Sequence, residues 1–511
     1  MPAGALDVLV VGGGIGGLAL AQALLPSGVN VQVYEREREA ADWVQGYRIH
    51  LNQAGARALR RCLPRPLWEV FLATSGHPGP GFGFHTHLLR RLLFVEESVM
   101  TGGAPSGGQY AVSRTVLRRI LLAGLEDVVH HGRTFQRYEV RPDGKVVAFF
   151  SDGTHAVGDV LVGADGTASR VRGQYLPRAR RVDTGALAIG ARTPLDDHTR
   201  AWMPGHLADG LNLVLPPAGS AMFTATFNAA RKAGDPPAVH PGGTVPPADR
   251  TGPADPADPE GLEGPAGDTL SPIGPGVPPG AAGADPAGRD AGPATQEPGL
   301  GGLGLDPGSL TAGLRDYVLW AFVARRGAYP AGAADLDGHG LRDLAGAMTS
   351  GWHPVLRRLV AEADPATIRL MPFRTSVPVE AWPATRVTLL GDAIHAMTPA
   401  MGFGANVALR DAALLADRLV AFHRGEGTLT EAVGGYEERM REYGFRAVRT
   451  SARLASFMIS DRSLVRRGAK AWFRLCDALP PVRRMTFGGQ WTDTTPQRAP
   501  AADRGGTTAR P

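Results

Sequence analysis

Three glycines and one acid near the start of the chain have the spacing of a dinucleotide-binding turn. Gly12, Gly14 and Gly17 follow the apolar run 8–11 and open an apolar helix, and Glu35 ends the next apolar run. The first glycine permits a tight turn, the second lets backbone approach a pyrophosphate, and the third lets helix and strand pack closely. Phosphates favour a helix N-terminus, and an acid at this position accepts hydrogen bonds from ribose hydroxyls. These residues predict a bound dinucleotide without saying which one.

Two later apolar runs also end in turns that contain Gly and Asp. Residues 160–163 lead into Asp165, and residues 387–390 lead into Asp392. Ligands bind at the carboxyl ends of strands in an open α/β sheet. A single Gly–Asp turn is typical of an ordinary loop, but three such turns can surround one extended cofactor.

Composition limits the classes of function. The chain has 511 residues, enough for two or three domains, and its net charge of +5 comes from scattered arginines, so we expect no nucleic-acid partner. Its two cysteines, Cys62 and Cys476, favour a reducing, cytoplasmic location and supply no cysteine metal site. The apolar stretch 6–25 lacks a basic start and carries the motif glycines, so we expect no signal peptide or transmembrane segment. The sequence leaves the oligomeric state open.

Together the three turns resemble the motifs of the FAD-dependent aromatic hydroxylases, the single-component flavoprotein monooxygenases of the para-hydroxybenzoate hydroxylase and salicylate hydroxylase type. The matching segments occur in the family's order and span residues 8–418. They are the fingerprint Gly12–Gly17 with Glu35, the motif Asp159–Gly166, and Gly391–His395 followed by Pro399, Gly402, Gly404, Ala405, Asn406 and Asp411.

The resemblance implies an α/β fold. A Rossmann-like, three-layer FAD-binding domain with a mostly parallel sheet would be interleaved with an α+β substrate domain on a mixed sheet, and C-terminal helices would follow. The expected segments are 1–75, 113–182 and 381–430 for the FAD-binding domain, 76–112 and 183–380 for the substrate domain, and 431–495 for the helices.

The resemblance also implies roles for single residues. Gly12, Gly14, Gly17 and Glu35 would hold the adenosine half of FAD, Asp165 would lie near the pyrophosphate, Asp392 would hold the ribityl chain, and Arg114 would reach the FAD. The turn Pro399–Asn406, with Gly402, Gly404 and Ala405, would present backbone N–H groups to the flavin. Arg48 stands where many members have glycine, so a flavin contact, a nicotinamide contact and a substrate anchor stay open for it.

The implied activity is that of a monooxygenase. NADPH or NADH would reduce FAD, O2 would give a flavin C4a-hydroperoxide, and one oxygen atom would pass to an aromatic or polycyclic small molecule, in secondary metabolism or aromatic catabolism. The cofactor carries such chemistry, so no side chain is expected to be catalytic and no metal is expected. For His395 we favour a structural or flavin-side role over proton transfer. Hydroxylation, epoxidation and Baeyer–Villiger insertion are not separated.

Apolar residues from 202–227, 317–325 and 371–377 are expected to form the substrate pocket, although ordinary strand core competes with this interpretation. The candidates are Met222, Phe223, Trp320, Phe322 and Phe373. For His85 and His87, a role as pocket donors and a position in a loop stay equally open.

Residues 229–312 have no aromatic residue and are rich in Gly, Pro, Ala and Asp, a composition that buries too little apolar area to fold. We predict a disordered insertion between two strands of a hairpin, and a disordered tail at 496–511.

Other functions remain open at this stage. A flavin-dependent halogenase or reductase of the same fold is one, although no W-x-W-x-I-P segment is present, and a non-oxygenating FAD-binding redox module is another. The basic C-terminal region, from Arg446 to Arg474, would either attach to a membrane or, as we favour, pack on the FAD-binding domain.

Overall fold

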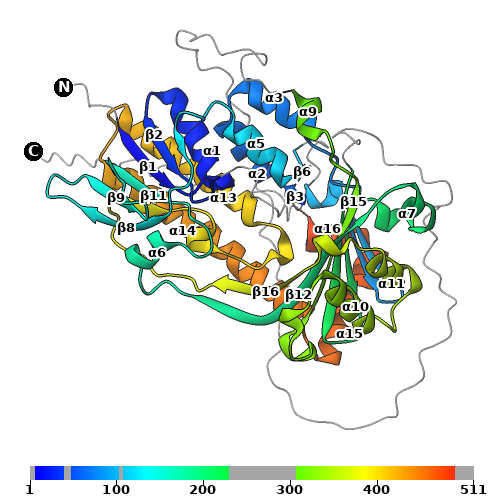
Figure 1. Ribbon diagram of the computed structural model, residues 1–511. Helices are drawn as coiled ribbons and strands as arrows, with labels where there is room; N and C mark the ends of the chain where they lie inside the picture. The colour runs from blue at the N-terminus through cyan, green and yellow to red at the C-terminus, as the bar shows by residue number, and fades with distance from the viewer. Residues whose placement is uncertain (1–5, 39–47, 103–107, 229–305, 489–511) are drawn as a thin grey trace, which may run out of the picture.

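The computed structural model describes residues 6–38, 48–102, 108–228 and 306–488. These residues form two bodies, each built on its own sheet (Figure 1). Residues 229–305 of the insertion predicted at 229–312, and the predicted tail 496–511, lie outside the described residues.

The first body is built on a five-stranded parallel sheet. Its strands, in spatial order, are β17 (Val387–Leu389), β11 (Val160–Gly163), β1 (Asp7–Val11), β2 (Asn30–Tyr34) and β7 (Val129–His130). Side chains of β1 alternate between two covered faces. On one face Val10 lies against α1 (Ile15–Leu24), and on the other Leu9 lies against Gly158 of the small sheet β8–β9–β10. The first body therefore has three layers: helices, the parallel sheet and the small sheet β8–β9–β10.

The elements around this sheet come from distant parts of the chain. Helix α1 packs against α5 (Arg114–Leu122) and α13 (Gly404–His423), and α13 packs against α2 (Gln53–Cys62) and α14 (Leu429–Met458). The small sheet consists of β8 (Phe135–Val140), β9 (Val146–Phe150) and β10 (His155–Gly158). A two-stranded sheet of β3 (Arg48–Leu51) and β6 (Tyr110–Ser113) lies beside α13.

The second body is built on a seven-stranded mixed sheet. In spatial order it contains β16 (Arg369–Ser376), β12 (Arg181–Pro194), β15 (Tyr317–Arg325), β14 (Ser220–Phe227), β13 (Leu211–Leu215), β4 (Gly81–Thr86) and β5 (Arg91–Glu96). Only the β13–β4 pair is parallel. Helices α10 (Gly338–Met348) and α11 (Pro354–Ala361) cover one face, and the end of α14 with α15 (Ser463–Ala478) covers part of the other.

Shorter helices complete the described chain. They are α3 (Arg65–Thr74), α4 (Glu97–Met100), α6 (Arg170–Tyr175), α7 (Asp197–Trp202), α8 (Gly205–Ala208), α9 (Pro307–Thr311), α12 (Asp392–His395) and α16 (Pro480–Phe487).

The strands on either side of the insertion pair as predicted. β14 and β15 are antiparallel, with Phe227 opposite Tyr317. The insertion prediction was wrong at its end, because residues 307–311 form α9. Asp306 caps this helix by accepting a hydrogen bond from Ser309 N–H (2.7 Å), and Leu310 is buried in the core of the first body.

The expected packing of the C-terminal helices was wrong in part. Helix α14 does pack on the first body, but α15 packs on β5, at the edge of the second sheet. Its apolar residues Trp472, Phe473 and Cys476 join Leu93 and Val95 in one cluster. The exposed edge strand therefore gains a covering helix, which protects its side chains from solvent.

Candidate cofactor and active site

The glycines of the turn after β1 differ in what surrounds their Cβ positions. Gly12 has φ +112°, and a Cβ there would lie 2.4 Å from Ala164 O; a Cβ on Gly17 would lie 2.1 Å from Gly12 O. A Cβ on Gly14 would meet nothing within 4 Å, and its φ of −77° is ordinary. Gly12 and Gly17 are thus required by the protein itself, whereas Gly14 borders open space that a pyrophosphate could enter.

Two helices begin beside this space without a side-chain cap. The N-cap residues Gly14 of α1 and Phe403 of α13 provide no side-chain hydrogen bond, whereas Thr428 and Glu431 form a capping box on α14. Before α13, Gly402 has φ +63° and open space around its Cβ position. Free N–H groups at helix N-termini attract anions, so both helix starts fit the negative parts of a dinucleotide.

The two acids predicted near the adenosine and pyrophosphate keep acceptor capacity. Glu35 accepts hydrogen bonds from Gly13 N–H (2.6 Å) and Glu37 N–H (3.0 Å), one on each carboxylate oxygen. Asp165 accepts from Arg170 N–H (2.7 Å) through Oδ2, while its Oδ1 is buried without a partner in the described chain. A carboxylate has about four acceptor positions, so each group can still bind a ligand hydroxyl or water.

Two arginines of α5 lie one helical turn apart and face this space. Arg114 is close enough to Asp392 for the carboxylate to favour its charged form, although burial, the larger effect, lowers the arginine pKa. The second, Arg118, is buried and donates from Nε to Gly13 O (3.2 Å), and the charges of Glu35 and Glu37 act on it. Arg118 was not predicted; its i, i+4 spacing from Arg114 on one helix face was the signal.

The Asn406 side chain ties the start of α13 to β3. Its Oδ1 accepts from Asn52 N–H (2.9 Å), and its Nδ2 donates to His50 O (2.9 Å). Arg48 lies two residues before His50, on the same side of β3; it is buried and donates from Nη2 to Pro78 O (3.1 Å). Burial lowers the pKa of Arg48 to about 10, with Tyr317 and Asp209 nearby. The strand that Asn406 holds thus also carries a buried cationic side chain, whose contacts are with Pro78, Tyr317 and Asp209.

His395 is held inside the protein. It is fully buried, and its Nε2 lies 2.6 Å from Asp411 Oδ2, which also accepts from Gly391 N–H (2.7 Å). Tyr443 donates its hydroxyl proton to the other oxygen of Asp411 (2.7 Å). Burial, the largest single effect, lowers the pKa of His395, but the charge and hydrogen bond of Asp411, with the charge of Asp392, together raise it above its ordinary value. This network fixes the β17–α12 turn and agrees with a structural role for His395.

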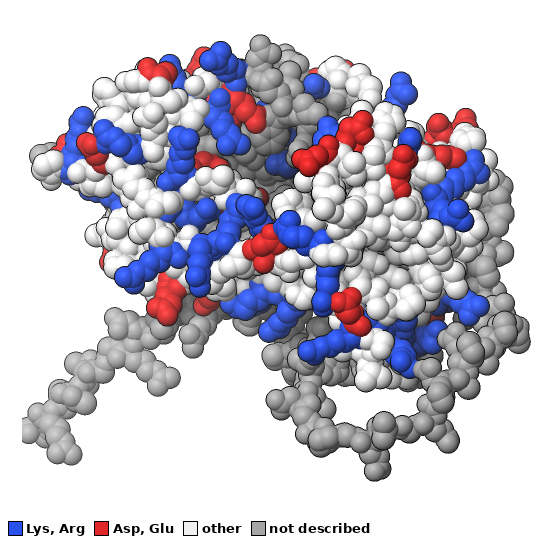
Figure 2. Space-filling model, turned by 60° about the horizontal axis from the view of Figure 1, so that its bottom comes forward, with Lys and Arg blue, Asp and Glu red and all other residues white. Residues whose placement is uncertain are grey.

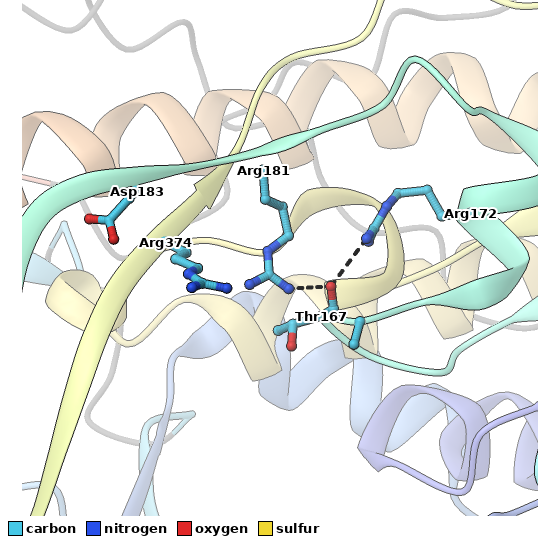
Figure 3. Close-up of a pocket in the computed structure, with 6 residues that line it drawn as sticks. Thr167, Arg172, Arg181, Asp183 and Arg374 are labelled. Carbon is cyan, nitrogen blue, oxygen red and sulfur yellow. Dashed lines mark hydrogen bonds between the residues drawn. The ribbon is translucent and has the colours of Figure 1, made fainter. Parts of the chain in front are cut away.

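A groove lined by arginines lies between the two bodies. Arg172, Arg181 and Arg374 surround a cavity of about 500 Å³ together with Thr167 and Asp183. The side chains of Arg181 and Arg374 point toward one another, while Arg172 and Arg181 both donate to Thr167 O (Figure 3). Basic side chains gather in a band across this underside of the molecule (Figure 2).

The groove continues toward the predicted flavin turn. A second cavity of about 340 Å³ shares Arg181 and Arg374 with the first and reaches Met397 and Pro399. Burial and then the charge of Arg374 lower the pKa of Arg181. Like charges held close together favour an anionic ligand between them.

Comparisons with known proteins identify the family. The sequence matches the family described as FAD binding domain over residues 351–451 and the NAD(P)-binding Rossmann-like domain over residues 10–68. The solved structure of a putative FAD containing monooxygenase from Photorhabdus luminescens is 30% identical, covers 89% of this chain and 99% of its own, and has a TM-score of 0.69. This chain belongs to the FAD-dependent monooxygenases. The predicted family and fold class are confirmed, and the domain match agrees with FAD as the cofactor.

Curated monooxygenases are similar over part of their length. The dual O-methyltransferase/FAD-dependent monooxygenase elcB of Phaeosphaeria nodorum is 31% identical over 80% of this chain and 40% of its own. The 3-amino-4-hydroxybenzoate 2-monooxygenase PtmB3 of Streptomyces platensis is 36% identical over 32% of this chain and 40% of its own. The chain spans less than half the length of the first curated relatives that it matches.

The two faces of the second sheet differ in what covers them. Met222, Trp320 and Phe322 are buried in one cluster with residues of α10 and α11. Phe373 belongs to the opposite cluster, which also contains Ala400 of the predicted flavin turn. Phe223 alternates with Met222 along β14 and so points to the Ala400 side. We therefore keep Phe223 and Phe373 as pocket candidates, and place the other three in the core under the helices.

Of the two candidate histidines, His85 lies in β4 and His87 lies in the turn that follows it. His85 is buried, lies 3.1 Å from Asn212 Oδ1 through Nε2, and stacks on His206 with ring centres 4.7 Å apart. Asn212 in turn donates to Thr224 Oγ1 (3.3 Å), which lies beside Trp320 on the helix-covered face. His85 is thus part of a polar network within that layer, and the structure does not bring it to the Ala400 side.

No helix among the described residues is long and apolar enough to cross a membrane. The part of the chain that the structure describes contains no group of three His, Cys, Asp or Glu side chains placed to hold a metal ion.

Proposed function

We propose that this protein is an FAD-dependent monooxygenase that uses NADPH or NADH and O2 to insert one oxygen atom into an aromatic or polycyclic small molecule. The observation that carries the proposal is the position of the turn before α13. Its Ala400 packs in one cluster with Phe373, Leu213 and Val323 of the second sheet. A flavin held at the start of α13 would therefore face an apolar floor that suits an aromatic ring.

The chain's own groups would position FAD and keep water away from it. The open space at Gly14 and the uncapped start of α1 would receive the pyrophosphate, and Asp392, opposite Arg114, would accept from the ribityl hydroxyls. When bound, FAD supplies the electron transfer and the activation of O2. The uncapped start of α13 would stabilise negative charge on the flavin because the positive end of the helix dipole lies there.

The arginine groove supports a dinucleotide reductant. Arg172, Arg181 and Arg374 offer guanidinium groups that match phosphate oxygens, and the groove leads to Pro399 beside the predicted flavin turn. If NAD(P)H binds there, Arg374→Ala would raise its KM about tenfold, the loss expected for one charge-assisted hydrogen bond. The exposed Arg357→Ala on α11 is the control and would leave KM unchanged.

Oxygen incorporation tests the proposal directly. The FAD-loaded protein is supplied with NADPH or NADH, with ¹⁸O2, and with a panel of aromatic compounds that includes 3-amino-4-hydroxybenzoate, the compound named for the Streptomyces relative. We expect at least one compound to accelerate NAD(P)H oxidation and to gain one ¹⁸O atom by mass analysis. NAD(P)H oxidation that reduces a substrate without ¹⁸O incorporation would contradict the proposal and favour a reductase of the same fold.

A further inference from the structure

Helix α15 has an inner face that explains its packing. Phe473 and Cys476 lie in the clusters that cover β4 and β5, and Arg466, which is buried, donates to Ser220 O (3.0 Å). This face holds the helix against the edge of the second sheet. The opposite face carries exposed residues.

The outer face of α15 is apolar where a surface helix is normally polar. Leu464 is 76% exposed and Leu475 is 42% exposed, and between them lie the exposed small residues Gly468 and Ala471. The spacing 464, 468, 471, 475 places all four on one stripe of the helix. Leu479, at 44%, and Met485 of α16, at 64%, extend the exposed apolar surface. Contiguous exposed apolar surface marks an interaction site.

Basic side chains border this stripe. Arg467 and Arg474 are exposed and follow the stripe along its next row, and Arg462 and Arg484 are exposed at its ends. Acids near this surface are engaged in ion pairs: Asp461 with Arg325 (2.7 Å), Asp477 with Arg91 (3.4 Å) and Glu96 with Arg483 (3.3 Å). The border is therefore positively charged.

The turn between β4 and β5 extends the same surface. The ion pair of Arg91 with Asp477 (3.4 Å) joins the end of this turn to α15, and the charge of Lys470 lowers the pKa of His87 after the larger effect of burial. The turn adds exposed Leu88 and Arg90, again an apolar side chain beside a basic one.

We infer that this surface, formed by Leu464, Leu475, Leu479 and Met485 with Arg467 and Arg474, docks the protein on an anionic lipid membrane. Helices of this kind lie in the plane of the interface, with leucines among the upper acyl chains and arginines at the lipid phosphates. Charge decides between occupants: a second copy would bring its own arginines against these, whereas anionic lipid neutralises them.

Vesicle flotation tests this inference on the full-length FAD-loaded protein. Vesicles of 30% phosphatidylglycerol in phosphatidylcholine are compared with pure phosphatidylcholine at low salt and at 0.5 M NaCl. We expect flotation only with the anionic vesicles and at least a tenfold smaller bound fraction in high salt. Absence of flotation, or equal flotation with both vesicle types, would overturn the inference.

Two variants separate the surface from net charge. Leu464→Glu combined with Leu475→Glu is expected to reduce the bound fraction at least tenfold, with unchanged FAD absorbance and thermal unfolding because both side chains are exposed. The control, Val140→Glu combined with Val157→Glu, adds two acids at exposed positions of β8 and β10 and is expected to bind as the wild type does. If light scattering shows a wild-type dimer that the double variant dissociates, the surface joins two copies and the membrane inference is wrong.

Discussion

At the scale of single residues, the opposed charges of Arg114 and Asp392 lie where the two halves of the proposed FAD site would meet. Arg114 begins α5 and Asp392 begins α12, two helices far apart in the sequence. The arginine pKa is lowered by burial, so some group must compensate for the desolvation of its charge. Asp392 does so in part, and a bound anionic cofactor would complete the compensation.

This arrangement predicts the effect of Arg114→Ala. The dissociation constant for FAD is expected to rise by about 10- to 100-fold, because a hydrogen bond to a charged group contributes about 1.5–3 kcal/mol. The measurement is a titration of the apoprotein with FAD, in which the quenching of flavin fluorescence reports binding. Arg119→Ala, an exposed arginine on the same helix, serves as the control. Equal affinities for both variants would contradict the position proposed for Arg114.

A second residue, Glu437 on α14, predicts a pH dependence of stability. Glu437 is buried, and it accepts a hydrogen bond from Thr388 Oγ1 (2.8 Å). Burial raises its pKa to about 7, against the lowering effect of its hydrogen bonds and of Arg441. Between the unfolded pKa near 4.5 and the folded pKa, the folded state binds more protons, so stability falls as pH rises through this window.

Glu437→Gln is expected to remove this part of the pH dependence. Above pH 7 the variant gains roughly 3 kcal/mol in the free energy of unfolding, at 1.36 kcal/mol per pKa unit, because the neutral amide still accepts the hydrogen bond. Urea unfolding of both proteins from pH 5 to pH 8 measures the difference. A gap between variant and wild type that stays the same across this range would show that Glu437 is not the titrating group.

At the scale of elements, two glycines of the β1–α1 turn have different structural roles. A Cβ on Gly14 meets no protein atom, whereas a Cβ on Gly17 would collide with the carbonyl of Gly12. We therefore expect Gly14→Ala to keep the thermal unfolding midpoint of the apoprotein and to weaken FAD binding. Gly17→Ala is expected to cost about 1–3 kcal/mol of stability through overpacking. Calorimetry of both apoproteins and FAD titration measure these effects; a destabilised Gly14→Ala apoprotein would contradict this division.

The turns could be predicted from sequence because the signal is local. Gly12 to Gly17 and Glu35 lie in one strand–helix–strand unit, whose spacing fixes their geometry. The pocket could not be predicted in this way, because helices cover one face of the second sheet and part of the other, and its strands are apolar on both sides. Met222 and Phe223 look equivalent in sequence, and only the packing of α10 and α11 shows that Met222 faces away from Ala400.

At the scale of the whole molecule, the order of the first sheet brings the three turns to one edge. β11 lies between β1 and β17, so Gly12, Asp165 and Asp392 follow neighbouring parallel strands. The apolar runs predicted these strands, and the family resemblance predicted that they lie together in one mostly parallel sheet. The position of α15 was not predictable from its own residues, because its partner β5 is distant in sequence and any apolar surface could have received Phe473.

The segment between β14 and β15 is expected to be replaceable by a shorter linker. Arg200 donates to both Asn228 Oδ1 (2.8 Å) and Asp316 Oδ2 (2.6 Å), so one side chain joins the two ends of the hairpin. Replacing residues 229–305 with a linker of about 20 Gly and Ser residues is expected to keep substrate-stimulated NAD(P)H oxidation and to raise stability by about 1 kcal/mol, because a shorter loop loses less entropy on closure. Thermal unfolding of the FAD-loaded protein measures the change.

The matched control also removes residues 306–312, and it is expected to lower the unfolding midpoint because Leu310 of α9 is buried against the first body. A lower midpoint for the first variant would show that residues 229–305 contribute to the fold, against their composition.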